Sequence, residues 1–234
     1  MMEALRSGKT LRVLVARGAR ETEGFRALID EAARANTPIE QVDAREIDRL
    51  GLTDHQGVAA IVEPPRELDD HGLANMEYPP AAMAVALDGV TDPQNLGACA
   101  RSAEAAGASV LIVRRRRAAP LTPSAVRASA GALLHLPMAR VTNLARTLEQ
   151  LKDLGFTVVG LDHRAARDIY SEVSPERPLV LVVGSEGAGL SRLVSESCDR
   201  LLSIPMPGRT GSLNASAALA VALFGYVLRP NGQD

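Results

Sequence analysis

Five strand-like apolar runs in the second part of the chain constrain its fold more than any other feature. The runs lie at 83–87, 109–113, 157–161, 179–183 and 200–204. Runs such as PLVLVVG are apolar throughout instead of alternating, which is typical of parallel strands covered on both faces. Helix-like segments lie between them or follow them, near 96–106, 124–132, 143–154 and 212–228. The repeated order of strand, loop and helix predicts an α/β domain built on a parallel sheet.

The first 63 residues predict a separate, smaller α/β domain. Strands are expected at 11–16, 38–43 and 57–62. Apolar residues recur at helical spacing from Phe25 to Ala33, and Asp43 precedes Glu46 at the spacing of a capping box. The stretch EPPRELDDHGLANMEYPP has four prolines and five acidic residues with little periodicity, so we expect a linker over 64–80. The larger domain then covers 81–234.

Composition favours a cytoplasmic enzyme without a metal or a membrane partner. The chain has 234 residues, of which 46% are hydrophobic and 23% charged, as in ordinary globular proteins. No apolar run is long enough for a signal peptide or a bilayer span. The two cysteines and four histidines are scattered without metal-ligand spacing. No catalytic triad or pair of carboxylates stands out, so we expect group transfer from a reactive donor, which depends on positioning.

Positive charge is concentrated locally in a chain whose net charge is −2. Arg114, Arg115, Arg116 and Arg117 are consecutive, and Arg127 follows downstream. The net charge argues against wholesale wrapping of nucleic acid. The run is either a solvated surface or a local basic face for phosphates.

The first of three conspicuous loops follows the run 83–87 and reads DPQNLGACAR. Asn95 is a good N-cap for the next helix. The apolar positions of that helix share one face, and Arg101 points the opposite way. The spacing leaves two interpretations of Arg101, an idle surface arginine paired with Glu104 or a group that meets a ligand.

Two further loops follow apolar runs nearer the C-terminus. VVGSEGAGLS has glycines that let the backbone approach a ligand, but it is neither a dinucleotide fingerprint nor a P-loop. Glu186 in this loop is either an exposed loop acid or a ligand-facing one. The third loop leads into an apolar helix whose first turn carries Ser212, Asn214 and Ser216, with Ser212 as the expected N-cap. Ligands of open α/β sheets collect at such strand ends.

Taken together and in this order, the three loops resemble the motifs of the SpoU (TrmH-like) family of RNA ribose 2′-O-methyltransferases. The matching segments are DPQNLGACAR, VVGSEGAGLS and SIPMPGRTGSLNASAALAVALF. The N-terminal domain also resembles the ribosomal-protein-like substrate-binding domain of the rRNA branch, with its first turn truncated. The third motif departs slightly, with Ala215 where valine is common.

The resemblance implies a parallel sheet with a C-terminal trefoil knot, a homodimer and S-adenosylmethionine bound in the knot. Position by position, it places cofactor contacts at Gly184, Ile204, Met206, Leu213 and Glu186. It places the catalytic site at Asn95, Arg101, Glu186, Ser212 and Asn214. Because arginine stays protonated in proteins, we expect Arg101 to clamp a phosphate or stabilise the developing alkoxide instead of acting as a simple base.

The resemblance therefore predicts an S-adenosylmethionine-dependent enzyme that methylates a ribose 2′-hydroxyl, with a guanosine of 23S rRNA as the leading substrate. An RNA substrate favours phosphate contacts by Arg114 to Arg117 and Arg127. The alternatives are a tRNA guanosine 2′-O-methyltransferase and an RNA-binding knot protein that has lost catalysis.

Overall fold

The computed structural model describes residues 1–52, 55–173, 175 and 177–229 of the chain. It divides into two compact units, Met1–Pro65 and Arg66–Asp234. The segment 64–80, for which the sequence predicts a linker, contains a short strand and a short helix that belong to the second unit.

The first unit is a three-stranded sheet with helices. Its strands are β1 (Thr10–Ala16), β2 (Ile39–Val42) and β3 (Val58–Val62), in the order β2-β1-β3. Its helices are α1 (Met2–Arg6), α2 (Glu23–Arg34) and α3 (Ala44–Asp48). β1 pairs in parallel with β2 and antiparallel with β3. The predicted capping box is confirmed, because Asp43 caps α3 and the Glu46 side chain accepts from the Asp43 backbone.

The second unit is a seven-stranded sheet in the order β10-β8-β9-β5-β6-β7-β4, and its strand pairs are parallel as predicted. Its strands are β4 (Glu67–Leu68), β5 (Met83–Asp88), β6 (Val110–Arg114), β7 (Met138–Val141), β8 (Thr157–Leu161), β9 (Leu179–Gly184) and β10 (Arg200–Leu202). The sequence predicts five of these and misses β4 and β7.

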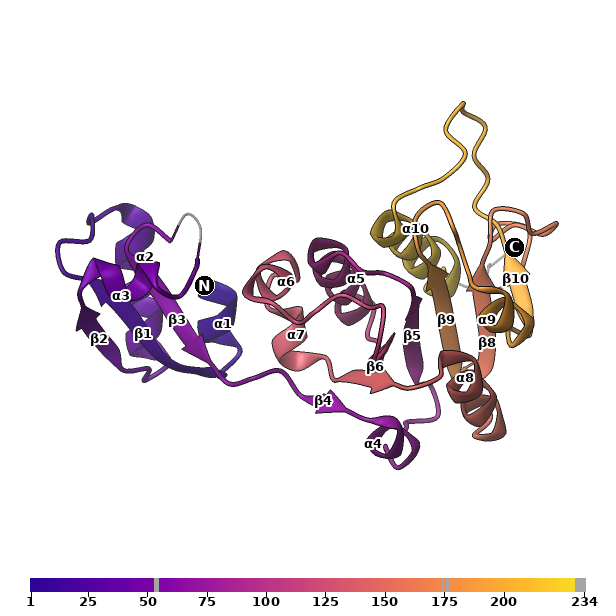
Figure 1. Ribbon diagram of the computed structural model, residues 1–234, viewed down its shortest axis with the longest axis horizontal. Coiled ribbons are helices and arrows are strands. Elements are labelled where there is room, and N and C mark those ends of the chain that lie inside the picture. Colours follow the sequence, from indigo (N-terminus) through magenta and orange to yellow (C-terminus); the bar gives the residue numbers. More distant parts are fainter. Residues whose placement is uncertain (53–54, 174, 176, 230–234) are drawn as a thin grey trace. The chain divides into compact units, whose positions relative to one another are not determined.

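Helices cover both faces of this sheet (Figure 1), as the continuous apolar runs require. One face packs against α5 (Pro93–Ala105), α6 (Pro123–Ala128), α7 (Ala132–His135), α10 (Ala215–Ala222) and the π-helix η1 (Leu223–Val227). The other face packs against α4 (Asp70–Ala74), α8 (Leu144–Asp153) and α9 (Arg192–Glu196). Successive residues of a strand serve opposite layers, and in β5 Val85 faces the first layer while Ala84 and Ala86 face the second.

Two predicted helix starts are wrong, and both errors have a local cause. α5 is capped by Asp92, whose carboxylate accepts from the backbone N–H of Gln94 and Asn95. Pro93 occupies the first helical position, where its missing N–H costs nothing, so the helix begins earlier than expected. α10 is capped by Asn214 and not by Ser212. In both cases the side chain expected to cap the helix is left for other contacts.

No helix in the described part of the chain is long and apolar enough to cross a bilayer. The same residues contain no group of three or more His, Cys, Asp or Glu side chains arranged to hold a metal ion. The threading of the C-terminal segment into a knot stays a prediction.

Candidate active site

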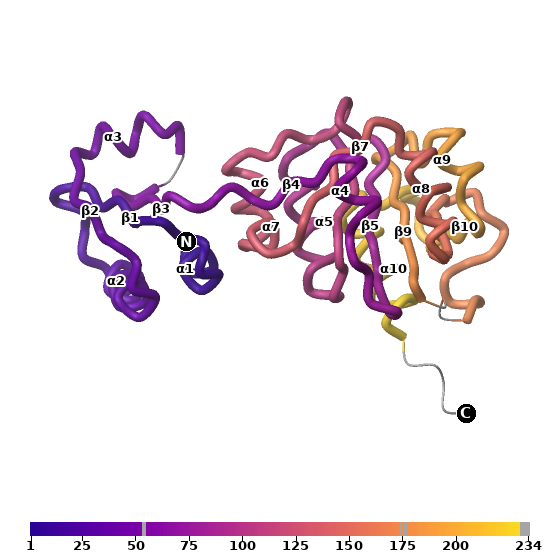
Figure 2. The backbone as a smooth tube through the Cα atoms, turned by 90° about the horizontal axis from the view of Figure 1, so that it is seen from below, coloured from indigo at the N-terminus to yellow at the C-terminus, as the bar shows by residue number. Residues whose placement is uncertain are grey.

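The three loops singled out in the sequence lie at the carboxyl edge of the second sheet. β5 and β9 are adjacent in the middle of that sheet (Figure 2), although β6, β7 and β8 lie between them in sequence. From β5 the chain proceeds to β6 on one side, while β9 and β8 lie on the other. Such a reversal of strand order is where open α/β sheets bind ligands.

A cavity of about 250 Å³ opens at this edge. Its walls come from the segments that follow β8, β9 and β10. The five residues predicted to contact the cofactor all line it, namely Gly184, Glu186, Ile204, Met206 and Leu213. Ser212, predicted as part of the catalytic site, lines it as well.

Glycine allows the tight backbone wall on the β9 side of the cavity. A Cβ built on Gly184 would lie 2.1 Å from the carbonyl carbon of Gly189, so no larger residue fits there. Gly187 and Gly189 have φ of +78° and +66°, in the left-handed region that favours glycine. The loop therefore folds back on itself, and Ser185 bridges to Gly189. A wall of this kind presents backbone groups to a ligand at close range.

Three predicted catalytic residues meet beside the cavity. The side-chain amide of Asn214 donates to Oδ1 of Asn95 at 3.0 Å, and lies 3.5 Å from Oε2 of Glu186. Oδ1 of Asn214 accepts from the backbone N–H and the hydroxyl of Ser216, at 2.9 and 2.7 Å. These contacts join the loops that follow β5, β9 and β10, and they leave the amide hydrogens of Asn95 available to a ligand.

Arg101 lies on α5, the helix that also carries Asn95, and its side chain is exposed. It forms no hydrogen bond or ion pair with any residue that the structure describes, and the alternative pair with Glu104 does not form. The apolar face of α5, with Leu96, Cys99 and Ala103, is fully buried. The predicted orientation of Arg101, away from the packed face, is confirmed.

Sequence reasoning missed Asp162 and His163, which line the cavity just after β8. Asp162 is buried, and Arg164 donates to both carboxylate oxygens, at 3.0 Å through Nε and 2.8 Å through Nη2. The hydrogen bonds from Arg164 lower the pKa of Asp162 below its ordinary value. The sequence could have identified Asp162 and His163 by the signal that identified the other loops, which is a polar side chain directly after an apolar strand.

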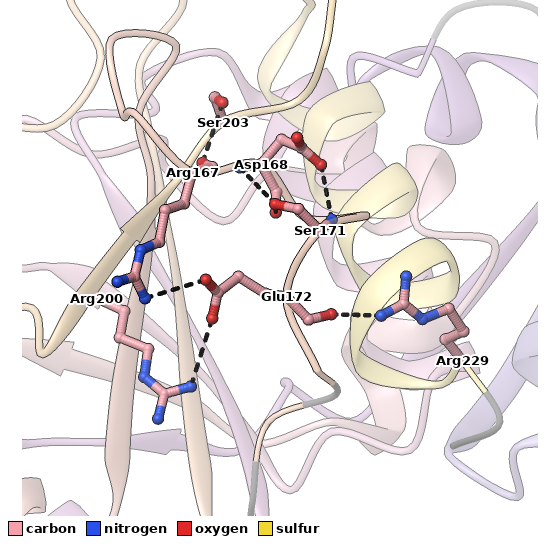
Figure 3. A network of polar contacts seen from close by, with 7 residues as sticks. All are labelled: Arg167, Asp168, Ser171, Glu172, Arg200, Ser203 and Arg229. Atoms are coloured by element: carbon pink, nitrogen blue, oxygen red, sulfur yellow. Dashed lines mark hydrogen bonds and ion pairs between the residues drawn. The ribbon is translucent and has the colours of Figure 1, made fainter. Parts of the chain in front are cut away.

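A network centred on Glu172 lies outside the lining of this cavity and connects the segment after β8 to β10 (Figure 3). Glu172 accepts from Arg167 at 3.2 Å and lies 3.9 Å from Arg200 on β10. The Ser203 hydroxyl donates to the carbonyl oxygen of Arg167 at 3.1 Å, and Arg229 donates to the carbonyl oxygen of Glu172. The segment after β8 and the start of the third loop are therefore fixed to each other.

The basic run divides in the structure. Arg115, Arg116 and Arg117 are exposed, with Arg115 3.8 Å from Asp70. Arg127 is exposed on α6. Arg114 instead turns inward and forms an ion pair with the buried carboxylate of Asp88.

Comparisons with known proteins match both units. Residues 82–224 match the SpoU rRNA Methylase family, and residues 1–68 match a family described as RNA 2′-O ribose methyltransferase substrate binding. The chain is 42% identical over 199 residues to the putative TrmH family tRNA/rRNA methyltransferase YacO of Bacillus subtilis, covering 84% of this chain and 80% of that protein. It is 41% identical over 207 residues to the 23S rRNA (guanosine-2′-O-)-methyltransferase RlmB of Photobacterium profundum, covering 88% and 84%.

A solved structure has the same fold. The SpoU methyltransferase AviRb of Streptomyces viridochromogenes, in complex with AdoMet, aligns with a TM-score of 0.75 at 29% identity. The alignment covers 97% of this chain and 86% of that one.

Proposed function

Because the chain belongs to the SpoU rRNA methylase family, whose members are RNA 2′-O-methyltransferases that use S-adenosylmethionine, we propose that it methylates the 2′-hydroxyl of a guanosine in 23S rRNA. The observation that carries the proposal is the contact between Asn95 and Asn214 beside the glycine-walled cavity. This contact joins Asn95, on the side where the RNA ribose would bind, to the loop after β10, which lines the cofactor cavity.

The cavity fits S-adenosylmethionine. The close approach of Gly184 and Gly189 gives a backbone wall suited to a flat ring and a polar tail, and Ile204, Met206 and Leu213 add apolar surface to the lining. When bound, the cofactor supplies a methyl group already activated on a sulfonium. The chain's own residues therefore have to orient the acceptor and handle its proton.

Asn95, Glu186, Ser212 and Asn214 would receive the target ribose. With Oδ1 of Asn95 occupied by Asn214, its amide hydrogens can donate to the ribose or to a neighbouring phosphate. Glu186 is exposed beside them and can accept a hydrogen bond from the 2′-hydroxyl, which orients the oxygen lone pair.

Arg101 would supply positive charge on the acceptor side. Its guanidinium has no partner among the described residues, so a phosphate beside the target ribose, or the developing alkoxide, can bind without displacing an internal contact.

RNA would also contact the exposed arginines Arg115, Arg116, Arg117 and Arg127 of the second unit. The first unit matches a substrate-binding family and has its own groove, lined in part by Arg17, Arg20 and His55. We infer in addition a homodimer, as the family resemblance implies, and a cytoplasmic location, where ribosomal RNA is found.

The test is transfer of labelled methyl from S-adenosylmethionine to unmodified 23S rRNA, 16S rRNA and tRNA in parallel, followed by mapping of the modified ribose. We expect label in 23S rRNA alone, on one guanosine. Label in tRNA alone would overturn the substrate. Cofactor binding by calorimetry without transfer to any RNA would instead indicate a knot protein that has lost catalysis.

A further inference from the structure

Asp88, the last residue of β5, is a buried acid that the transfer site does not use directly. Its side chain is 3% exposed. Oδ1 lies 2.5 Å from Nη2 of Arg114, and Oδ2 accepts from the backbone N–H of Ser191 at 2.7 Å. The same Nη2 donates to the Ser191 hydroxyl at 2.8 Å. The three groups form a closed triangle of charge-assisted hydrogen bonds.

This triangle joins the carboxyl ends of three adjacent strands. Asp88 ends β5, Arg114 ends β6, and Ser191 closes the loop that follows β9. Residues 184–187 and 189 of that loop line the cavity, and Glu186 lies beside Asn214. The loop begins at Gly184, which β9 fixes, so its position over the cavity also depends on how its other end at Ser191 is held.

The guanidinium is enclosed rather than offered to solvent. The side chain of Arg114 is 28% exposed, and its Nε is buried with no hydrogen-bond partner among the described residues. The buried carboxylate of Asp88 would be costly without a counter-charge. The guanidinium of Arg114 supplies that charge, which accounts for its inward position. Its neighbours Arg115 and Arg116 are exposed.

We propose that Arg114 is a positioning residue for the cofactor loop: through Asp88 and Ser191 it fixes residues 185–191, and so sets the affinity for S-adenosylmethionine instead of binding RNA. The proposal rests on the proposed function for the identity of the ligand. The restraint on the loop is a property of the cofactor-free protein and can be measured without any ligand.

The first measurement is hydrogen exchange of the cofactor-free full chain. Arg114→Met leaves Asp88 without its counter-charge, and we expect the amides of 185–191 to exchange about tenfold faster, with β5 and β9 unchanged. Asp88→Asn in the Arg114→Met background removes the unpaired charge and keeps an oxygen that accepts from Ser191. Protection should return to within about threefold of the wild type. Unchanged exchange in Arg114→Met would overturn the proposal.

The second measurement separates positioning of the cofactor from contact with RNA. In Arg114→Met we expect the Kd and KM for S-adenosylmethionine to rise about tenfold and kcat to fall less than that, because Glu186 lies in the loosened loop whereas Asn95, Arg101 and Asn214 lie outside it. The double variant should recover most of that affinity. A normal cofactor KM with a raised KM for RNA and a smaller salt dependence would make Arg114 an RNA contact and overturn the proposal.

Arg192→Met is the matched control. Arg192 follows Ser191 directly but is exposed and pairs with Glu196 on the same helix. Loss of Arg192 should leave hydrogen exchange of the 185–191 amides and the Kd for S-adenosylmethionine at wild-type values. Effects as large as those of Arg114→Met would show that removing any arginine near the loop loosens it, which would overturn a specific role for Arg114.

Arg114→Lys serves if Arg114→Met does not fold. It keeps the charge but not the planar fork, so a cofactor Kd raised about threefold is expected, and a wild-type Kd would count against the proposal. A wild-type protein that binds no S-adenosylmethionine would overturn the proposed function, while the exchange experiment would still decide whether Arg114 holds the loop.

Discussion

The side-chain amide of Asn214 donates to Oδ1 of Asn95 at 3.0 Å, although 119 residues separate the two along the chain. Asn214 at the same time caps α10, because its own oxygen accepts from the backbone N–H of Ser216. One side chain therefore starts the half-buried helix α10 and joins the loop after β5 to the loop after β10. The two roles can be separated by substitution.

Asn214→Ala should lose both roles, and Asn214→Ser only one. Alanine removes the cap and is expected to lower the free energy of unfolding by about 1 kcal/mol, whereas serine keeps a capping oxygen and should cost little. Neither can donate an amide hydrogen to Asn95, so both should lower methyl transfer about tenfold or more. Urea unfolding and turnover of the two variants check this. Wild-type turnover in Asn214→Ser would remove the contact from the mechanism.

Arg101→Ala should abolish methyl transfer, with a loss of at least about a hundredfold, and leave the Kd for S-adenosylmethionine nearly unchanged. The reason is that Arg101 is exposed and is not among the residues that line the cavity. Calorimetry and labelled transfer measure the two quantities. Arg146→Ala, an exposed arginine on α8, is the control. Equal losses in both variants would contradict a specific role for Arg101.

Gly184→Ala should abolish cofactor binding. The added Cβ would lie 2.1 to 2.5 Å from backbone atoms of Gly189 and Leu190, so the loop has to move, at a cost to stability of about 1–3 kcal/mol. At Gly208 the same substitution meets nothing within 4 Å and should change neither property. Thermal unfolding with and without S-adenosylmethionine measures both the stability and the cofactor binding of each variant. A ligand-induced shift that persists in Gly184→Ala would argue against this wall as the binding surface.

The stability conferred by Asp162 should depend on pH on the acid side. Hydrogen bonds from Arg164 lower its pKa below the ordinary value of 3.8. The stabilisation is therefore fully present above that value and is lost as the pH falls through the lower, folded-state pKa. Asp162→Asn should reduce the free energy of unfolding at neutral pH, and the difference from the wild type should narrow as the pH falls below 3.8. Urea unfolding of both proteins across this pH range measures the difference in the free energy of unfolding. A difference that does not change with pH would show that the substitution acts through packing and not through the charge of Asp162.

Replacing Arg115, Arg116 and Arg117 together by Met should weaken RNA binding at low salt and flatten its salt dependence. Each phosphate that the protein no longer neutralises reduces the slope of log K against log salt by about 0.7 for single-stranded RNA. Because these side chains are exposed and lie outside the cavity, the Kd for the cofactor should not change. Filter binding over a salt series measures the slope, and an unchanged slope would place the RNA elsewhere.

The sequence predicted the centre of the sheet better than the side formed by β7 and β4, for a physical reason. Strands β5 and β9 are buried on both faces, so their apolar runs are unbroken and unambiguous. β7 contains Arg140, whose guanidinium reaches Glu67, and β4 is two residues long, so neither shows a clear pattern. These strands owe their pairing to tertiary context.

The sequence predicted the residues of the candidate site that a motif places at strand ends. It predicted less well the side chains whose orientation depends on a partner elsewhere in the chain. Gly184, Ile204 and Leu213 line the cavity as the resemblance implies, although their contact with a cofactor stays a prediction. The inward turn of Arg114 could not be predicted, because four consecutive arginines look alike until one of them meets Asp88. Asp92 and Asn95 compete to cap α5, and only the geometry of Pro93 decides between them.

The pairing of β4 with β7 has a practical consequence for dividing the protein. A fragment that begins at residue 81 would lack β4 and leave the backbone groups of β7 unpaired along an open edge, where another chain can add a strand. It would also lose Asp70, whose carboxylate accepts from the backbone N–H and hydroxyl of Thr142 just beyond β7. A fragment that begins at Arg66 retains both, so the catalytic half is best isolated from there if self-association is to be avoided.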